Sequence, residues 1–425
     1  MEDKPSPSVL HPRRGLLRLL GRILGTERVS QTYLEFIKMH AGYLLFTNMK
    51  SLFVNTLLIR VTGDDSLVMK FNLMQFICIP FAYTLGSFYI RRCSLPKAAK
   101  WGMVFSAVFY VVFFLSLGNL VLMLPLLSVI TAVSFGFYTL ANQSMTVEYC
   151  EDDNREAAIS ISGVVSGVIS MLMPIVNGAI ISAFPGLSGY YAVFGVSMVI
   201  AFFSIRQTGK LPDDHIPGKI HFRETLHDAL HSRPFILAGL AETFKGVREG
   251  VFTFFLNVLL FECIQSEFLV GVNTFLVGIF SIFGCWLLGR LVRPNNRIRY
   301  MCAALFSLLC ITCVLLFRMN ALTVMLMSVC NSFFTCFTLN PSSSMQFYVV
   351  SQMPKSQERK AEYLALKAYF LALGRVAGVM IVSAMPGTAQ GSVFGLLAIT
   401  LLQFGTPVMY YFAVKDASAL SGQKD

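Results

Sequence analysis

Apolar stretches of about twenty residues, nearly free of charge, follow one another along most of the 425-residue chain. A helix of that length crosses the hydrocarbon core of a membrane. Lipid offers the backbone no hydrogen-bonding partner, so uninterrupted stretches of this kind must be helical. Charged residues make up only 13% of the chain and hydrophobic residues 55%, which excludes an ordinary soluble domain. The sequence therefore predicts an all-α membrane protein.

The apolar stretches predict twelve transmembrane helices. We place them at 38–61, 67–90, 99–118, 120–147, 157–184, 188–206, 234–262, 267–290, 300–318, 321–349, 361–385 and 391–414. The N-terminal segment, the connections after even-numbered helices and the tail hold 26 of the 34 Lys and Arg residues. Since positive residues flank the cytoplasmic side, we expect both termini in the cytoplasm. The net charge of +11 thus reflects topology, and no nucleic-acid partner is expected.

The chain repeats itself at an offset of about 200 residues. The repeated segments are SLFVNTLL and TFFLNVLL (51–58, 253–260), YTLANQSM and FTLNPSSSM (138–145, 337–345), NREAA and ERKAE (154–158, 358–362), and SAFPG and SAMPG (182–186, 383–387). Because each copy crosses the membrane an even number of times, the two halves are parallel. The predicted division is a cytoplasmic segment 1–33 with a basic amphipathic helix at 14–25, a six-helix half 34–207, a cytoplasmic linker 208–233, a second half 234–416 and a cytoplasmic tail 417–425.

This plan of two parallel six-helix repeats resembles the major facilitator superfamily over residues 34–416. Gly86, Arg91 and Arg92 resemble the glycine and basic part of the family's loop between the second and third helices, while Ile90 stands in place of its acidic residue. The resemblance implies alternating access, with a substrate site near mid-membrane between the halves. It also implies that the first and seventh helices line the central cavity.

Polar residues at membrane depth are the candidate site, because a charge there costs about 2.5–3.5 kcal/mol. The predicted substrate-binding residues are Lys50, Asn48, Asn55, Arg248, Asn257, Arg375, Asn142 and Asn340. Glu242, Lys245 and Glu249, at i, i+3 and i+7 on the seventh helix, are candidates for proton coupling or a charge gate. In one interpretation the central cations bind an anionic group and a carboxylate carries a proton. In the other, the charges of the seventh helix neutralise one another and lock the halves together.

A second group of residues lies at the predicted cytoplasmic surface. Arg91, Arg92 and Arg155 are the candidate cytoplasmic gate, and the acidic run 148–156 is the expected partner of the first two. Two GxxxG patterns, 163–167 and 374–378, predict close helix packing. Cys310 and Cys313 form a CxxC inside a predicted helix and are expected to pack rather than react.

The sequence favours a secondary active transporter of a small anionic or zwitterionic solute, coupled to protons. The alternatives are an exporter or flippase of lipids or amphipathic compounds, and a non-transporting membrane sensor or scaffold. Since patterns such as GxSxG and HExxH are missing from the sequence, enzymatic activity is not expected. The expected partners are a small-molecule substrate, the lipid bilayer and H⁺, with no cofactor or metal, and the protein is expected to be a monomer. The expected location is a bacterial plasma membrane.

Overall fold

The computed structural model describes residues 30–62, 66–150, 155–184, 188–213, 221–252, 267–317, 319–383 and 389–421. Predictions for segment 14–25 and for Asn257 therefore fall outside the described residues. The first set of long helices comprises α2 (Gln31–Thr62), α3 (Ser66–Arg92), α4 (Leu95–Leu115), α5 (Leu120–Tyr149), α6 (Arg155–Ser182) and α7 (Ser188–Gln207). After a short helix, α8 (Phe222–His231), the second set comprises α9 (Arg233–Phe252), α11 (Glu267–Leu291), α12 (Arg297–Phe317), α13 (Ala321–Gln352), α14 (Ser356–Ser383), α15 (Ala389–Leu402) and α16 (Gly405–Ser421).

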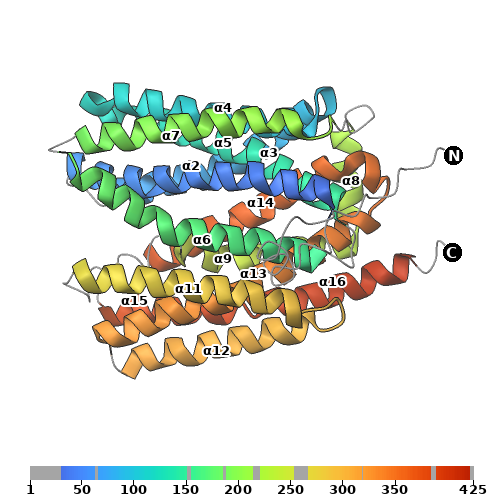
Figure 1. Cartoon of the computed structure of the whole chain (residues 1–425). Helices are drawn as coiled ribbons and strands as arrows, with labels where there is room; N and C mark the ends of the chain where they lie inside the picture. Colours follow the sequence, from blue (N-terminus) through green and yellow to red (C-terminus); the bar gives the residue numbers. More distant parts are fainter. Residues whose placement is uncertain are drawn as a thin grey trace, which may run out of the picture.

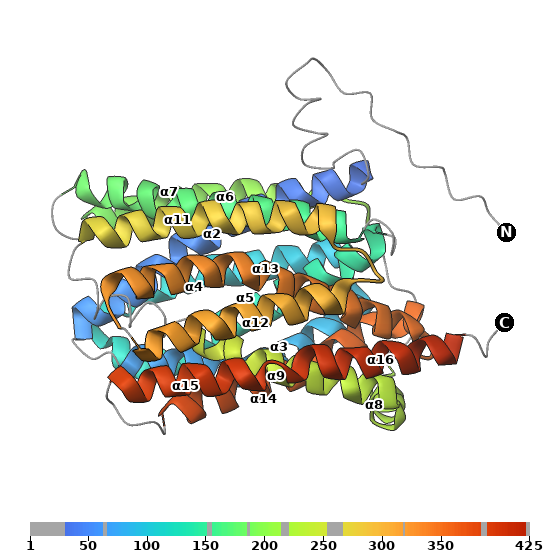
Figure 2. The same ribbon diagram turned by 90° about the horizontal axis from the view of Figure 1, so that it is seen from below.

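The long helices run side by side as one bundle (Figures 1 and 2), and Figure 1 shows most of α2–α7 on one side and most of α9–α16 on the other. Within the described residues, ten helical spans are long and apolar enough to cross a membrane by length and composition. The start of α2, the end of α16 and α8 lie at the same end of the bundle (Figure 1), which we call the α8 end. The prediction of an all-α membrane protein is confirmed, and these spans agree with twelve transmembrane helices in two parallel six-helix halves.

The outer surface of the bundle is apolar, as expected of helices that face lipid. The side chains of Leu115 and Phe317 are 83% and 90% exposed, and many other large apolar residues project outward. Charged side chains that would be costly in lipid instead lie inside the bundle, among them Glu242, Arg248 and Lys367. Apolar side chains thus lie outside and some charged side chains inside, the opposite of a soluble protein, so the interior charges are the candidate functional groups.

Glycines bring the two halves into close contact where α6 packs against α11. A Cβ atom at Gly163 would lie 2.7 Å from the sulfur of Cys285, and one at Gly167 would lie 2.9 Å from a side-chain carbon of Ile282. Both distances are too short for a real side chain. The sequence prediction that the 163–167 glycines serve packing is therefore confirmed, and the packing partner is the opposite half of the protein.

Glycines also allow α14 to approach α9 within the second half. Added Cβ atoms at Gly374 and Gly378 would overlap the carbonyl oxygens of Thr243 and Val247. The second GxxxG pattern thus also serves packing, as predicted. This close approach of two backbones lets charged side chains on α9 and α14 reach one another inside the bundle.

The last predicted helix, 391–414, is broken in the structure. Helix α15 ends at Leu402 and α16 begins at Gly405, and the two belong to one span, Val393–Ala419. Pro407 has no N–H to continue the hydrogen bonding of α15, which contributes to the interruption. A Cβ atom at Gly405 would come within 2.6 Å of the Phe244 ring, so the break lies in close contact with α9.

Candidate substrate site and gate

Helix α9 carries four charged residues at positions 242, 245, 248 and 249, within two helical turns. Glu242 is fully buried, and Lys245 and Arg248 are 5% and 3% exposed. A buried charge is tolerated when it is paired and hydrogen-bonded. The contacts of each group therefore indicate what it does.

Glu242 is held by three groups from three helices. Its Oε2 lies 2.6 Å from Lys245 Nζ on α9 and 3.6 Å from Lys367 Nζ on α14. The hydroxyl of Tyr410 on α16 donates to its Oε1 at 2.5 Å and lies 3.2 Å from the side-chain oxygen of Gln346. Two ammonium groups and a phenol hydrogen bond stabilise an ionised carboxylate. This arrangement is that of a structural anchor joining α9, α14 and α16.

Glu249 lies two turns farther along α9 and is more accessible. Its Oε1 accepts a hydrogen bond of 2.6 Å from Arg375 Nη2 on α14, and its side chain is 29% exposed. The guanidinium of Arg375 also lies over the ring of Phe76 on α3, 5.3 Å from its centroid. Arg375 therefore connects a carboxylate of the second half to an aromatic ring of the first half. A partly exposed carboxylate can exchange its partner for a proton more readily than the enclosed Glu242.

Arg248 differs from its neighbours on α9. Its Nη2 donates to the side-chain oxygen of Asn331 on α13, and its guanidinium lies 3.9 Å from the centroid of the Phe252 ring. Its Nε is buried without a hydrogen-bond partner, and among the described residues no carboxylate pairs with it. Arg248 is thus a buried cation held by an amide and an aromatic ring, with a donor left free.

The six interior charges do not cancel. The basic groups are Lys245, Arg248, Lys367 and Arg375, and the acidic groups are Glu242 and Glu249, which leaves a formal charge of +2 among the described residues of this cluster. A surplus of buried positive charge is unfavourable unless an anion compensates it. The electrostatics of the cluster therefore favour an anionic ligand.

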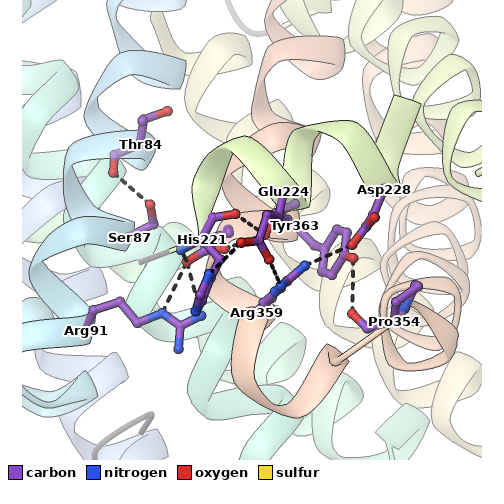
Figure 3. A network of polar contacts seen from close by, with 11 residues as sticks. Thr84, Ser87, Arg91, His221, Glu224, Asp228, Pro354, Arg359 and Tyr363 are labelled. Carbon is purple, nitrogen blue, oxygen red and sulfur yellow. Dashed lines mark hydrogen bonds and ion pairs between the residues drawn. The ribbon is translucent and has the colours of Figure 1, made fainter. Parts of the chain in front are cut away.

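At the α8 end, an ion pair joins the two halves. The guanidinium of Arg91 on α3 contacts Glu362 Oε1 on α14, with Nη2 at 3.1 Å and Nε at 3.2 Å (Figure 3). The two side chains are 2% and 0% exposed. A second pair across the halves lies nearby, with Lys360 Nζ 2.7 Å from Glu148 Oε2 on α5. These contacts close the α8 end of the bundle.

Helix α8 is bound to the same part of α14 (Figure 3). The hydroxyl of Thr225 donates to Glu362 Oε2, while Arg359 pairs with Glu224 and, at 2.8 Å, with Asp228. A hydrogen bond from His221, together with the nearby guanidinium of Arg359, holds the pKa of Glu224 below its ordinary value. Glu362 therefore contributes both to the contact between the halves and to the docking of α8.

The sequence model of the Major Facilitator Superfamily matches residues 43–379, most of the chain. The protein belongs to the Major Facilitator Superfamily. Members of this superfamily are transporters rather than enzymes. The match supports the resemblance drawn from the repeat and from the twelve-helix plan.

Relatives and solved structures agree with this assignment. The chain is 24% identical over 397 residues to the Uncharacterized protein YqgE of Bacillus subtilis (strain 168). The aligned residues cover 93% of this chain and 92% of the relative. The crystal structure of FucP in the outward conformation matches 90% of this chain and 99% of its own, with a TM-score of 0.68 and 11% identity. The crystal structure of the human organic anion transporter MFSD10 matches 95% of this chain and 100% of its own, with a TM-score of 0.60 and 14% identity. At these identities the two structures show the shared fold of the superfamily.

The structure places the residues of the predicted gate in different surroundings. Arg91 lies in the closed interface, but the partner identified is Glu362 of the opposite half, which the sequence did not suggest. Glu148, from the acidic run, pairs with Lys360. Arg92 is exposed at the end of α3, and no ion pair involves it among the described residues. The side chain of Arg155 lies outside the described residues.

The predicted asparagines are in different surroundings. Asn48 bonds to the carbonyl of Leu44 and accepts a 3.3 Å hydrogen bond from Ser170 on α6, which is packing within one half. Asn142 has a buried, unpartnered side-chain oxygen. A Cβ atom at Gly163 would lie 3.8 Å from the amide nitrogen of Asn340, which places Asn340 at the contact between the halves.

The two remaining predicted residues are on α2. Lys50 and Asn55 lie on this helix, but their side chains are outside the described residues. Their role in substrate binding stays a prediction.

Sequence reasoning missed four residues that complete these contacts. Asn331 and Tyr410 gave no signal, because a lone polar side chain in an apolar helix looks like ordinary packing. Lys367, a rare charge within a predicted helix, gave a signal that could have singled it out. Glu362 stands inside the repeated segment ERKAE, so comparison of the two copies could have marked it.

Proposed function

We propose that the protein is a secondary active transporter that moves a small anionic solute by alternating access, coupled to protons. The observation that carries the proposal is Arg248, a buried guanidinium whose described contacts are all uncharged and whose Nε lacks a partner. Guanidinium is the side-chain group best suited to bind carboxylate or phosphate through paired donors. The formal charge of +2 in the cluster supports the same sign of ligand.

Glu249 is the proposed proton carrier. It is paired with Arg375 yet partly exposed, and it lies one residue from Arg248 on α9. Protonation of Glu249 would release Arg375 and add one positive charge to the cluster, which favours anion binding. Proton and anion would then bind together, as symport requires. Glu242 is less suited to this role because Lys245 and Lys367 enclose it.

The closed α8 end supports alternating access. Arg91–Glu362 and Lys360–Glu148 must separate before a solute can leave by that end. We further propose that this end faces the cytoplasm of a bacterium, that both termini lie there, and that the chain divides at the linker 208–233, in agreement with the distribution of basic residues.

Uptake into proteoliposomes tests this function. The purified protein is given an inward proton gradient and a panel of radiolabelled carboxylates, phosphate esters and, as controls, amines of similar size. We expect gradient-driven uptake of an anion. In Glu249→Gln, gradient-driven uptake should fall while exchange of the same anion across the membrane persists. Transport of amines in preference to anions would refute the anionic solute, and an unchanged gradient dependence in Glu249→Gln would refute the role of that carboxylate.

A further inference from the structure

Two buried thiols face each other between α11 and α13. The Sγ atoms of Cys285 and Cys336 are 2.9 Å apart, and the two residues are 4% and 8% exposed. Both are free cysteines. Closing this gap to a disulfide bond of about 2.05 Å requires a relative movement of less than about 1 Å. Among proteins of a reducing compartment, such readily formed disulfides are typically transient and redox-sensing.

The register of the two helices fixes this approach. A row of small side chains on α13, spaced four residues apart, bonds to α11. The bonds run from Ser328 Oγ to Asn273 Oδ1 at 2.7 Å, from Ser332 Oγ to the Val277 carbonyl at 2.8 Å, and from Cys336 Sγ to the Ser281 carbonyl at 3.6 Å. Cys336 continues a ladder that holds the backbones close and parallel. Cys285, one turn beyond Ser281, is thereby held against it.

We propose that Cys285 and Cys336 form a redox-modification site that a peroxide oxidises to a disulfide. One thiolate attacks the peroxide O–O bond, which gives a sulfenic acid and releases hydroxide; the second thiol then attacks that sulfur and releases water. With hydrogen peroxide, two thiols and one H₂O₂ yield one disulfide and two H₂O. A small dithiol reductant reverses the reaction by thiol–disulfide exchange.

The site lies where oxidation can affect the contact between the halves. Ser160 on α6 donates to the carbonyl oxygen of Cys285, and Gly163 leaves room for the Cys285 sulfur. Drawing that sulfur toward Cys336 alters the surface on which α6 packs. The expected consequence, slower transport, rests on the proposed function, whereas formation of the disulfide does not.

Peptide mapping tests formation of the disulfide separately from its effect on transport. The full-length protein in lipid nanodiscs is treated with hydrogen peroxide, blocked with maleimide, digested and analysed without reduction. We expect a linked Cys285–Cys336 peptide pair, loss of two of the ten thiols, and recovery of both after dithiothreitol. Cys336→Ser, which extends the serine ladder, and Cys285→Ala should each abolish the link. Cys310–Cys313, the CxxC on α12, is the internal control and should not cross-link.

Oxidation of the exposed Cys310 without any Cys285–Cys336 peptide would overturn the proposal, as would the same loss of two thiols in both variants as in the wild type. Uptake measured on the same samples should fall on oxidation of the wild type and not of Cys336→Ser. A reversible link without any change in uptake would leave the modification standing and refute only its effect on transport.

Discussion

Arg91 on α3 and Glu362 on α14 join the two halves through a buried ion pair, with Nη2 and Oε1 3.1 Å apart. The same carboxylate accepts a hydrogen bond from Thr225 on α8. The contact between the halves and the docking of the linker helix therefore depend on one side chain. Loss of that charge must affect both.

Glu362→Gln should open the α8 end. Removal of one partner of a buried ion pair costs about 3–5 kcal/mol, because the buried Arg91 then lacks the carboxylate of Glu362, and separation of the halves exposes its guanidinium to water. Spin labels at the exposed positions 100 and 358, on opposite halves, should show a longer distance population in the variant. Lys97→Gln, which breaks the exposed pair with Asp213, should leave the distances unchanged. Equal distances in Glu362→Gln and wild type would contradict the role of this pair.

Glu242→Gln should destabilise the second half strongly. The substitution leaves Lys245 and Lys367 buried without their carboxylate, at a cost of about 3–5 kcal/mol. Unfolding monitored in detergent by thermal scans should show a large fall in Tm. The matched control is Arg233→Gln, since the side chain of Arg233 is 78% exposed and the ion pair of so exposed an arginine contributes about 0–1 kcal/mol. Similar Tm values for the two variants would argue against the anchor.

Gly378→Ala should disrupt the contact of α9 with α14. The added methyl group overlaps the carbonyl oxygen of Val247, and overpacking of this kind costs about 1–3 kcal/mol or more. Gly195→Ala on α7 is the matched control, because no atom lies within 4 Å of its added Cβ. Thermal stability should fall for the first variant and stay the same or rise for the second. Equal thermal stability of both variants would show that α9 and α14 can move apart without a loss of stability.

Docking of α8 should weaken on acidification. The pKa of Glu224 is lowered in the folded protein by its hydrogen bond with His221 and by Arg359, so its contribution is present above the ordinary glutamate pKa and is lost as the pH falls through the lowered value. The protection of α8 amides against hydrogen exchange, measured relative to their intrinsic exchange rate at each pH, should therefore fall across that acidic range. Glu224→Gln should show fast exchange already at neutral pH, whereas Glu358→Gln, at an exposed position, should match the wild type. A wild-type exchange profile in Glu224→Gln would contradict this account.

The sequence was sufficient to predict the helices, but insufficient to predict which charged side chains on them form ion pairs. Apolar length and the repeat predicted twelve helices and two halves because lipid permits few alternatives. The GxxxG glycines were also predictable, since small residues in apolar helices serve packing. Arg375 shows where prediction from sequence ends. Its position deep in a transmembrane helix was visible in the sequence, but its pairing with Glu249 depends on how closely α14 approaches α9.

The break between α15 and α16 was hidden for a similar reason. The segment is apolar throughout, and Pro407 alone is compatible with a continuous kinked helix. Contact of Gly405 with Phe244 of α9 belongs to the tertiary structure. Likewise, only the tertiary structure shows that Asn331 accepts a hydrogen bond from Arg248 and so belongs to the candidate site.

Binding of an anion by Arg248 tests the central claim most directly. The panel of carboxylates and phosphate esters is screened for a rise in Tm of the wild type, and the best anion is titrated against Arg248→Gln and against Arg299→Gln, an exposed arginine on α12. We predict that Arg299→Gln binds as the wild type does, and that Arg248→Gln loses at least about tenfold in affinity, or about 1.4 kcal/mol. Equal stabilisation of all three proteins by the anion would show that Arg248 serves packing, and would contradict the account.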